Sequence, residues 1–379
     1  MGGLGNLICW GILPVIVAIG GFYMQYQANV FKLLDIGKHV YNHYPGPCRV
    51  VEGLEYGAEK VIVLPNGLAV IGSGIKLAGR NMTWVENSGL FLFDFTNPWQ
   101  NVTKFQFSSN YDPTGFNPHG IAFYENQRTG RISLFLVNHR PDGDAIEVFD
   151  IDFANIRLIF KKAFRHPLIY NINDIAPTGE NSFFATIDQY STSERGKYWE
   201  IFGFLKWGRV IHVDGSEAKV VWEGLNYPNG LAITRDRRHL YVAEFVGGDI
   251  QVFDVSQKDK SLKHVRSIAT HTHPDNIEID HDSGDLWIGS HPVFFRIFQL
   301  KKGPIAPASQ VIKISYDPIA NRAPIINEVF SDDGMILMGS AGAAHWKSRL
   351  LVGSVFERLV YCEINVPYTA NDIVDRWTI

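Results

Sequence analysis

A segment pattern that recurs about every fifty residues constrains the fold of this chain more than any other feature. Each copy places Pro, Asn, Asp or Gly directly ahead of a short apolar stretch, and most copies are followed by a second strand-like stretch. The copies are LPNGLAVI (64–71), NPHGIAFY (117–124), NINDIAPT (171–178), YPNGLAIT (227–234), HPDNIEID (273–280) and SDDGMILM (331–338). This period, with several strands per unit, is typical of a propeller, so six copies predict an all-β, six-bladed β-propeller.

The repeat also predicts a cluster of polar side chains. Equivalent positions of the blades are related by rotation about a central channel, so residues that head the innermost strands meet at one mouth of it. These residues are His119, Asn173, Asn229, Asp275 and Asn276, with Glu59 as a weaker candidate just before VIVL. Carboxylate and amide oxygens without a thiolate fit Ca²⁺ better than zinc or copper. The alternative is that each Asn or Asp only forms its own turn.

The N-terminus favours a membrane anchor. Residues 1–31 carry no charged side chain, and LICWGILPVIVAIGGFYMQY (7–26) is nearly all apolar and long enough to span a bilayer. A cleaved signal peptide usually has a basic region ahead of a shorter apolar core. We therefore expect an uncleaved transmembrane signal-anchor over residues 1–30, the other interpretation being a buried helix.

The orientation of this anchor and the state of the cysteines are open at this point. Lys32 and Lys38 favour the cytosol for the segment after the anchor. The glycosylation sequons at Asn81 and Asn101 favour the lumen. The distant pair Cys48 and Cys362 is either two buried thiols or a disulfide in an oxidising compartment, which would tie the last strand of the ring to the first.

Two aromatic segments suggest surfaces beyond the propeller, which we place at residues 48–379. An amphipathic juxtamembrane helix is expected over 31–47, where Phe31, Leu34 and Tyr41 lie near one helical face. KYWEIFGFLKWG (197–208) interrupts the repeat after the third blade, so the insert 191–208 is expected to form a lid that faces a membrane or a partner. Core packing is the alternative for both.

Other functional classes find little support in the chain. The formal net charge of −4 provides no basic face, so we expect no nucleic-acid partner. There is no GxSxG elbow, no P-loop and no CxxC pair.

Taken together, the motifs resemble the paraoxonase family of calcium-dependent lactonases and arylesterases over residues 31–364. The resemblance rests on LPNGLA, FNPHGI, VNHRPDGD, NINDI, YPNGLAI, DNI…GDLWIGSHP and GSVFERLVYCEI. It implies a propeller with an extracytoplasmic location, a closing disulfide between Cys48 and Cys362, and catalytic histidines at His119 and His139. It also implies that a catalytic calcium is held by Glu59, Asn173, Asn229, Asp275 and Asn276.

The sequence departs from the family pattern at the second, structural calcium. The family has an Asp directly after the residue that Glu59 matches, and this chain has Lys60. The other contributors, the Ile121 backbone and Asp174, are present. An ammonium has only donors and cannot ligate a cation, so we expect one calcium and a Lys60–Asp174 ion pair in place of the second. Gln189 also stands where the family commonly has His.

Two functions follow from this resemblance. The first is a membrane-anchored calcium-dependent hydrolase of lactones and aryl esters, in which His119 is the general base and His139 fixes its tautomer. The second is a catalytically weak or inactive accessory subunit for assembly of a sodium-type ion channel. Some nematode relatives act in this way, and the chain is similar to them in its anchor and in Lys60. Either function implies a single-pass protein of the endoplasmic reticulum or plasma membrane, with its propeller in the lumen or outside the cell.

Overall fold

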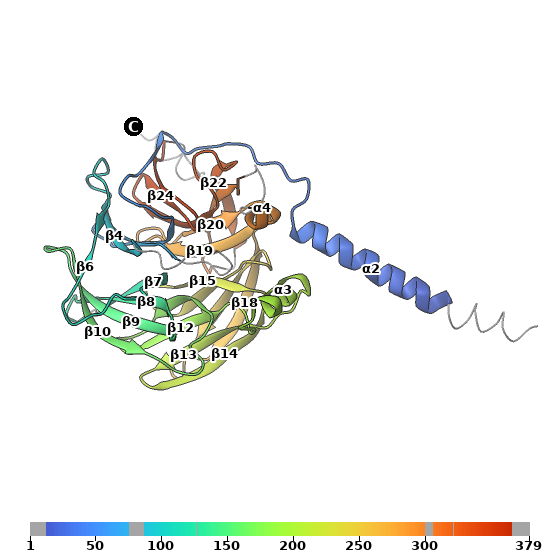
Figure 1. Cartoon of the computed structure of the whole chain (residues 1–379), viewed down its shortest axis with the longest axis horizontal. Helices are drawn as coiled ribbons and strands as arrows, with labels where there is room; N and C mark the ends of the chain where they lie inside the picture. The colour runs from blue at the N-terminus through green and yellow to red at the C-terminus, as the bar shows by residue number, and fades with distance from the viewer. Residues whose placement is uncertain (1–12, 76–86, 127, 300–305, 321, 366–379) are drawn as a thin grey trace, which may run out of the picture.

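The computed structural model describes residues 13–75, 87–126, 128–299, 306–320 and 322–365 (Figure 1). Six β-sheets, antiparallel apart from one added edge strand, surround a central axis, which confirms the predicted six-bladed propeller. From the axis outward, the first blade contains β2 (Ala58–Val63), β3 (Leu68–Ser73), β4 (Gly89–Asp94) and β5 (Thr103–Lys104). The second blade contains β7 (Pro118–Glu125), β8 (Ile132–Arg140), β9 (Gly143–Asp152), β10 (Arg157–Phe164) and the edge strand β6 (Gln106–Phe107). The third blade contains β11 (Ile172–Pro177), β12 (Ser182–Ile187), β13 (Gly208–Asp214) and β14 (Glu217–Leu225).

The other three blades follow the same order along the chain. The fourth blade contains β15 (Pro228–Ile233), β16 (His239–Glu244), β17 (Asp249–Val255) and β18 (Leu262–Ala269). The fifth blade contains β19 (His273–Ile279), β20 (Leu286–His291), β21 (Ser309–Ser315) and β22 (Ile325–Asp332). The sixth blade contains β23 (Ser340–Trp346), β24 (Arg349–Ser354), β25 (Leu359–Glu363) and β1 (Cys48–Val50). Each blade packs apolar side chains against its neighbours, as Phe135 of the second blade does against Phe183 of the third. This burial is the main source of stability in such a ring.

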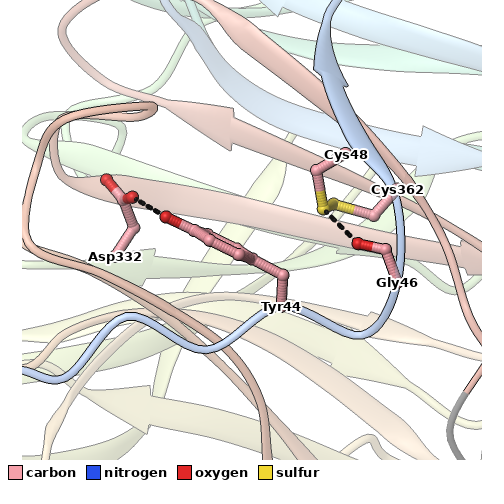
Figure 2. The surroundings of a disulfide bond; sticks show 5 residues. All are labelled: Tyr44, Gly46, Cys48, Asp332 and Cys362. Carbon is pink, nitrogen blue, oxygen red and sulfur yellow. Dashed lines mark hydrogen bonds between the residues drawn. A yellow bond between two sulfur atoms is a disulfide. The ribbon is translucent and has the colours of Figure 1, made fainter.

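The N-terminal strand closes the ring. β1 pairs with β25 and completes the sixth blade, with Cys48 directly opposite Cys362. The two residues form a disulfide, as Figure 2 shows, and so the predicted bond is confirmed. In the same region the Tyr44 hydroxyl donates to Asp332 Oδ2 at 2.6 Å, which fastens the segment ahead of β1 to the fifth blade (Figure 2). The first and last strands of the propeller, β1 and β25, are thereby joined covalently as well as by backbone hydrogen bonds.

Two of the six repeat segments do not head an innermost strand, contrary to the sequence pattern. LPNGLAVI (64–71) forms the turn between β2 and β3 and then most of β3. SDDGMILM (331–338) ends β22 and continues as a loop, because Asp332 Oδ1 accepts backbone N–H bonds from Gly334, Ile336 and Leu337. The sixth innermost strand begins only at Ser340.

The helix that precedes the propeller is α2 (Leu13–Leu33), which projects away from the blades (Figure 1). Among the described residues, no helix is both long and apolar enough to cross a membrane. The predicted anchor lies partly outside the described residues, since 1–12 are not among them.

The prediction of an amphipathic helix over 31–47 is wrong. α2 ends at Leu33, Asp35 has a positive φ of 54°, and residues 38–42 have no helical structure. The physical reason is a set of long-range contacts: Asp35 Oδ2 lies 3.0 Å from His273 Nε2 and accepts the Phe294 backbone N–H at 3.1 Å. Side-chain periodicity cannot reveal these partners, because they lie far away in the sequence.

Two short helices lie on the face of the propeller that α2 meets. α3 (Glu194–Phe202) lies in the β12–β13 connection and is capped by Ser193, whose side chain accepts from the Gly196 N–H. α4 (Phe294–Gln299) lies in the β20–β21 connection. The ends of α2, α3 and α4 pack together around Val246 and Phe245. A helix therefore forms within the insert 191–208, and its role as a lid stays a prediction.

Candidate active site

A backbone irregularity at the start of each innermost strand positions the candidate site. In all six of these strands the pairing register shifts just after the first residues, for example between Ile172 and Ile175 in β11 and between Pro274 and Ile277 in β19. A bulge of this kind frees residues from the ladder and re-aims their side chains. The polar residues at the shifts are Glu59, His119, Asn173, Asp174, Asn229, Asp275 and Asn276, and the sixth blade has Ala341 and Gly342 there.

The tight packing of the strands at this level explains the glycines of the repeat. A Cβ on Gly120 would lie 2.6 Å from the Asp174 Cα, and one on Gly230 would lie 2.4 Å from the Asp275 backbone oxygen. Only glycine allows neighbouring innermost strands to approach this closely. Gly120 follows His119, and Gly230 follows Asn229, so the same glycines hold the polar residues near the axis.

Each of the five predicted calcium ligands has a buried side-chain oxygen with no hydrogen-bond partner among the described residues. These oxygens are Glu59 Oε2, Asn173 Oδ1, Asn229 Oδ1, Asp275 Oδ1 and Asn276 Oδ1. Leaving a buried polar atom unpaired is costly, and such atoms in one place call for a ligand. Carboxylate and amide oxygens are the ligand types that Ca²⁺ takes, in sets of about six to eight that water can complete. The residues present therefore fit a calcium ion.

The second oxygen of each carboxylate, Glu59 Oε1 and Asp275 Oδ2, is held by a donor of the protein. Asn276 Nδ2 donates to Glu59 Oε1 at 2.7 Å and to the Glu59 backbone oxygen at 3.1 Å, which leaves the Asn276 oxygen free. His291 Nε2 donates to Asp275 Oδ2 at 2.9 Å. Each carboxylate thus has one oxygen fixed by the protein and one open. Donors that orient metal ligands in this way are typical of metal sites.

The electrostatics of the cluster also favour a cation. Burial raises the pKa of Asp275, and the nearby Glu59 charge adds to that shift. Burial likewise raises the pKa of Asp188, whose Oδ1 is also buried without a partner. Clustered buried carboxyls repel one another unless a positive charge lies between them. Among the described residues no three His, Cys, Asp or Glu side chains form a metal-ligating group, so the candidate centre depends on its amide oxygens.

The two predicted catalytic histidines are in contact beside this cluster. His119 Nδ1 lies 2.9 Å from His139 Nε2, and His119 Nε2 lies 3.5 Å from Glu59 Oε1. On its far side, His139 Nδ1 lies 2.7 Å from Asp144 Oδ1. Burial lowers the pKa of His119, but the charge and hydrogen bond of Glu59, together with the charges of Asp188 and Asp275, outweigh it and leave that pKa raised. The pair has the geometry of a proton relay that ends at the cluster.

Lys60 lies deeper in the channel and pairs with Asp174 as expected. Its Nζ lies 2.7 Å from Asp174 Oδ2 and 3.2 Å from the Ile277 backbone oxygen. Both side chains are almost completely buried, and Asp174 Oδ2 also accepts the Leu231 N–H. The ammonium thus takes Oδ2 of the carboxylate that the resemblance would assign to a second calcium, while Asp174 Oδ1 is buried without a hydrogen-bond partner among the described residues. The residues present do not fit that second ion.

Beyond Lys60 a cavity of about 280 Å³ opens at the other mouth of the channel. It is walled by apolar residues of the innermost strands such as Ile62, Ile175 and Ile233. Lys60 also lines this cavity, so the Lys60–Asp174 pair separates it from the oxygen cluster. The chemistry described above lies on the opposite side of that pair.

Sequence analysis missed several residues that complete the site. His291 appears in the sequence only within the SHP motif, which does not indicate its role. Its contact with Asp275 depends on the pairing of β19 with β20. Asp144 was visible in HRPDGD, where a two-residue turn sets it opposite His139. That hairpin signal could have identified it. Asn81 lies outside the described residues, and Asn101 is exposed between β4 and β5.

The fold and the site define a six-bladed β-propeller with a candidate calcium centre beside a histidine pair. A family model described as Arylesterase matches residues 39–364. Human Serum paraoxonase/arylesterase 2 is 31% identical over 363 residues, covering 95% of this chain and 100% of the relative. Human Serum paraoxonase/arylesterase 1 is 34% identical over 319 residues, covering 84% and 88%. The chain therefore belongs to the paraoxonase/arylesterase family.

The fold is also similar to that of a more distant protein of known structure. A luciferin-regenerating enzyme aligns with a TM-score of 0.52 at 13% sequence identity, covering 86% of this chain and 98% of the other. At this identity the similarity supports the propeller fold alone.

Proposed function

We propose that this protein is a calcium-dependent hydrolase of esters and lactones. The observation that carries the proposal is the set of five unpartnered, buried oxygens at the heads of the innermost strands, where the His119–His139 contact also lies. Membership of the arylesterase family supports it. Glu59, Asn173, Asn229, Asp275 and Asn276 would hold the ion.

The chemistry divides between the ion and the histidines. Calcium, when bound, supplies a Lewis acid that polarises the substrate carbonyl and stabilises the oxyanion. His119 Nε2 faces the cluster and takes a proton from the attacking water, while His139 shares the resulting positive charge. His119 then returns the proton to the alkoxide or phenoxide that leaves. Glu59 Oε1, 3.5 Å from His119 Nε2, favours the protonated imidazole during this step.

The test uses the full chain in detergent with an aryl acetate and a six-membered lactone as probes. We expect hydrolysis in buffered calcium, loss of it with a calcium chelator, and recovery on adding calcium back. His119→Gln should lower kcat by about 100-fold or more, since general base catalysis contributes at least that much. Calcium-loaded protein that hydrolyses neither probe would remove the proposal.

We further propose that the N-terminal segment attaches the protein to a membrane, with the propeller on the lumenal or extracellular side. Apolar residues such as Val17 and Phe22 are exposed along α2, and the disulfide fits an oxidising compartment. A glycan on the exposed Asn101 would support this orientation, and its removal by an endoglycosidase would match the gel shift of Asn101→Gln. An unglycosylated Asn101 with both cysteines free in native membranes would contradict it.

The accessory role in assembly of a sodium-type channel is the second candidate function. The observation that favours it is a group of exposed aromatic side chains around α3, including Tyr190, Trp199 and Trp207, which could contact a membrane protein. Gln189 also turns inward and donates to the Lys197 backbone oxygen, so it is not available to a substrate. Channel surface expression that depends on Trp199 but not on His119 would favour this role over hydrolysis.

A further inference from the structure

Asp144 is a carboxylate that holds the histidine pair. It is the second residue of β9, directly after Gly143, and lies opposite His139 in the β8–β9 ladder. Its Oδ1 is 2.7 Å from His139 Nδ1. Its Oδ2 accepts the backbone N–H of Ile172 at 3.1 Å, so both oxygens have fixed partners. Ile172 directly precedes Asn173, and therefore the carboxylate links the histidines to a strand of the candidate calcium centre.

The contacts from Asp144 to His139 and from His139 to His119 determine which ring nitrogen of each histidine carries the hydrogen. An ionised carboxylate only accepts, so His139 Nδ1 must carry its hydrogen toward Asp144. In neutral His139, Nε2 then accepts, and the hydrogen on the 2.9 Å contact belongs to His119 Nδ1. His119 Nε2 is left with a lone pair directed to the side of Glu59. Burial raises the pKa of Asp144, but its hydrogen bonds to His139 and the Ile172 N–H, together with the charges of His139 and His119, outweigh this and leave the pKa lowered, which favours the ionised carboxylate.

We propose that Asp144 is the positioning residue of an Asp144–His139–His119 relay, which sets both tautomers so that His119 Nε2 is the proton acceptor. The reasoning is that of the catalytic triad, in which a buried acid selects the tautomer of the base without touching the substrate. The inference rests on the proposed hydrolase function, since it assigns a role within the same site.

An isosteric substitution separates this role from a structural one. In Asp144→Asn the Ile172 N–H still requires an acceptor, so the amide oxygen turns toward Ile172 and the NH₂ group turns toward His139. His139 Nδ1 must then accept, which moves its hydrogen to Nε2. His119 Nδ1 becomes the acceptor of that hydrogen, and His119 Nε2 becomes protonated. The substitution thus reverses the order of hydrogens and removes the base without changing the size of the side chain.

The experiment combines kinetics with nitrogen NMR of the histidine rings in the full-length, calcium-loaded protein. In the unmodified protein both rings should carry hydrogen on Nδ1, and in Asp144→Asn both should carry it on Nε2. We expect kcat to fall by about 100-fold or more with KM changed by less than about threefold, because Asp144 does not touch the substrate. Spectra of His119→Gln and His139→Gln assign the two rings.

Asp142→Asn is the matched control. It makes the same change of charge two residues away, where an exposed carboxylate pairs with Arg165. It should leave the tautomers and kcat unchanged. Should Asp144→Asn fold poorly, Asp144→Ala provides the second measurement: formate, but not chloride at equal ionic strength, should restore activity, because a carboxylate can re-enter a site that is partly open to solvent.

The results separate this inference from the proposed function. Unmodified protein with hydrogen on His139 Nε2, or an Asp144→Asn enzyme with unchanged tautomers and kcat, would overturn the role of Asp144 while hydrolysis stood. Correct tautomers in a protein that hydrolyses nothing would leave the relay in place and remove the hydrolase function instead.

Discussion

Replacing Lys60 by Met tests whether its ammonium takes the place of a structural cation. Lys60 Nζ and Asp174 Oδ2 are 2.7 Å apart, and the two side chains are 3% and 0% exposed. Burial lowers the pKa of Lys60, but the charge and hydrogen bond of Asp174, together with the charges of Glu278 and Glu59, outweigh it and leave that pKa raised. Met fills a similar volume and removes the charge. Removing one partner of a buried pair costs about 3–5 kcal/mol of the free energy of unfolding, because a buried charge is left unpaired.

The protonation of Asp174 limits that cost and gives it a pH dependence. Burial already raises the pKa of Asp174 above the ordinary value of 3.8, and the loss of Lys60 raises it further. Protonating this carboxyl at pH 7 costs about 4 kcal/mol, at about 1.4 kcal/mol per pH unit. The folded variant then binds one more proton than the unfolded chain, so its stability falls as pH rises. The penalty should therefore be about 1–2 kcal/mol at pH 5 and about 4 kcal/mol at pH 7.

Urea denaturation in buffered calcium at both pH values measures this difference. Lys161→Met is the matched control, since Lys161 pairs with Asp150 at the surface and should contribute less than about 1 kcal/mol at either pH. Adding Asp174→Asn to Lys60→Met should remove the pH dependence. Lys60→Asp should instead gain a second calcium site in a calorimetric titration. A Lys60→Met penalty no larger than that of the surface control, and equal at both pH values, would refute the reasoning.

Three further outcomes are expected. Asp275→Asn should weaken calcium binding at least about tenfold in a titration, because the ion loses one of its charged ligands, and unchanged affinity would contradict the proposed centre. Replacing Cys48 and Cys362 by Ser should lower the free energy of unfolding by about 2–5 kcal/mol, as the long loop is no longer closed, and an unshifted urea midpoint would argue against this. Burial lowers the pKa of His212 to about 4, so stability should fall as pH drops from 6.5 through 4. His212→Phe should make that loss smaller by about 1–3 kcal/mol, and equal acid sensitivity of the two proteins would exclude the assignment.

The propeller and much of the candidate site could be predicted because both follow from periodicity. A ring of similar blades turns a repeat in sequence into rotation in space, so Asn173 and Asn229 are brought together although they lie in different blades. The Lys60–Asp174 pair was predictable from charge alone once the two positions were known to be close. Errors arose where the repeat is imperfect: Asp332 looks like the head of an innermost strand, yet its side chain binds the backbone of a loop.

What periodicity cannot supply is the set of side-chain contacts that differ from blade to blade. His291 lies in the fifth blade and Asp144 in the second, and the two share no sequence pattern. His291 orients the carboxylate of Asp275, and Asp144 orients the imidazole of His139. Their roles depend on which residue faces them across a hairpin, and therefore on strand register and turn length. The β8–β9 hairpin shows that this information is partly local, since one residue more in the turn would move Asp144 away from His139 and invert its face. The turn of HRPDGD is thus as necessary to the proposed base as the histidine itself.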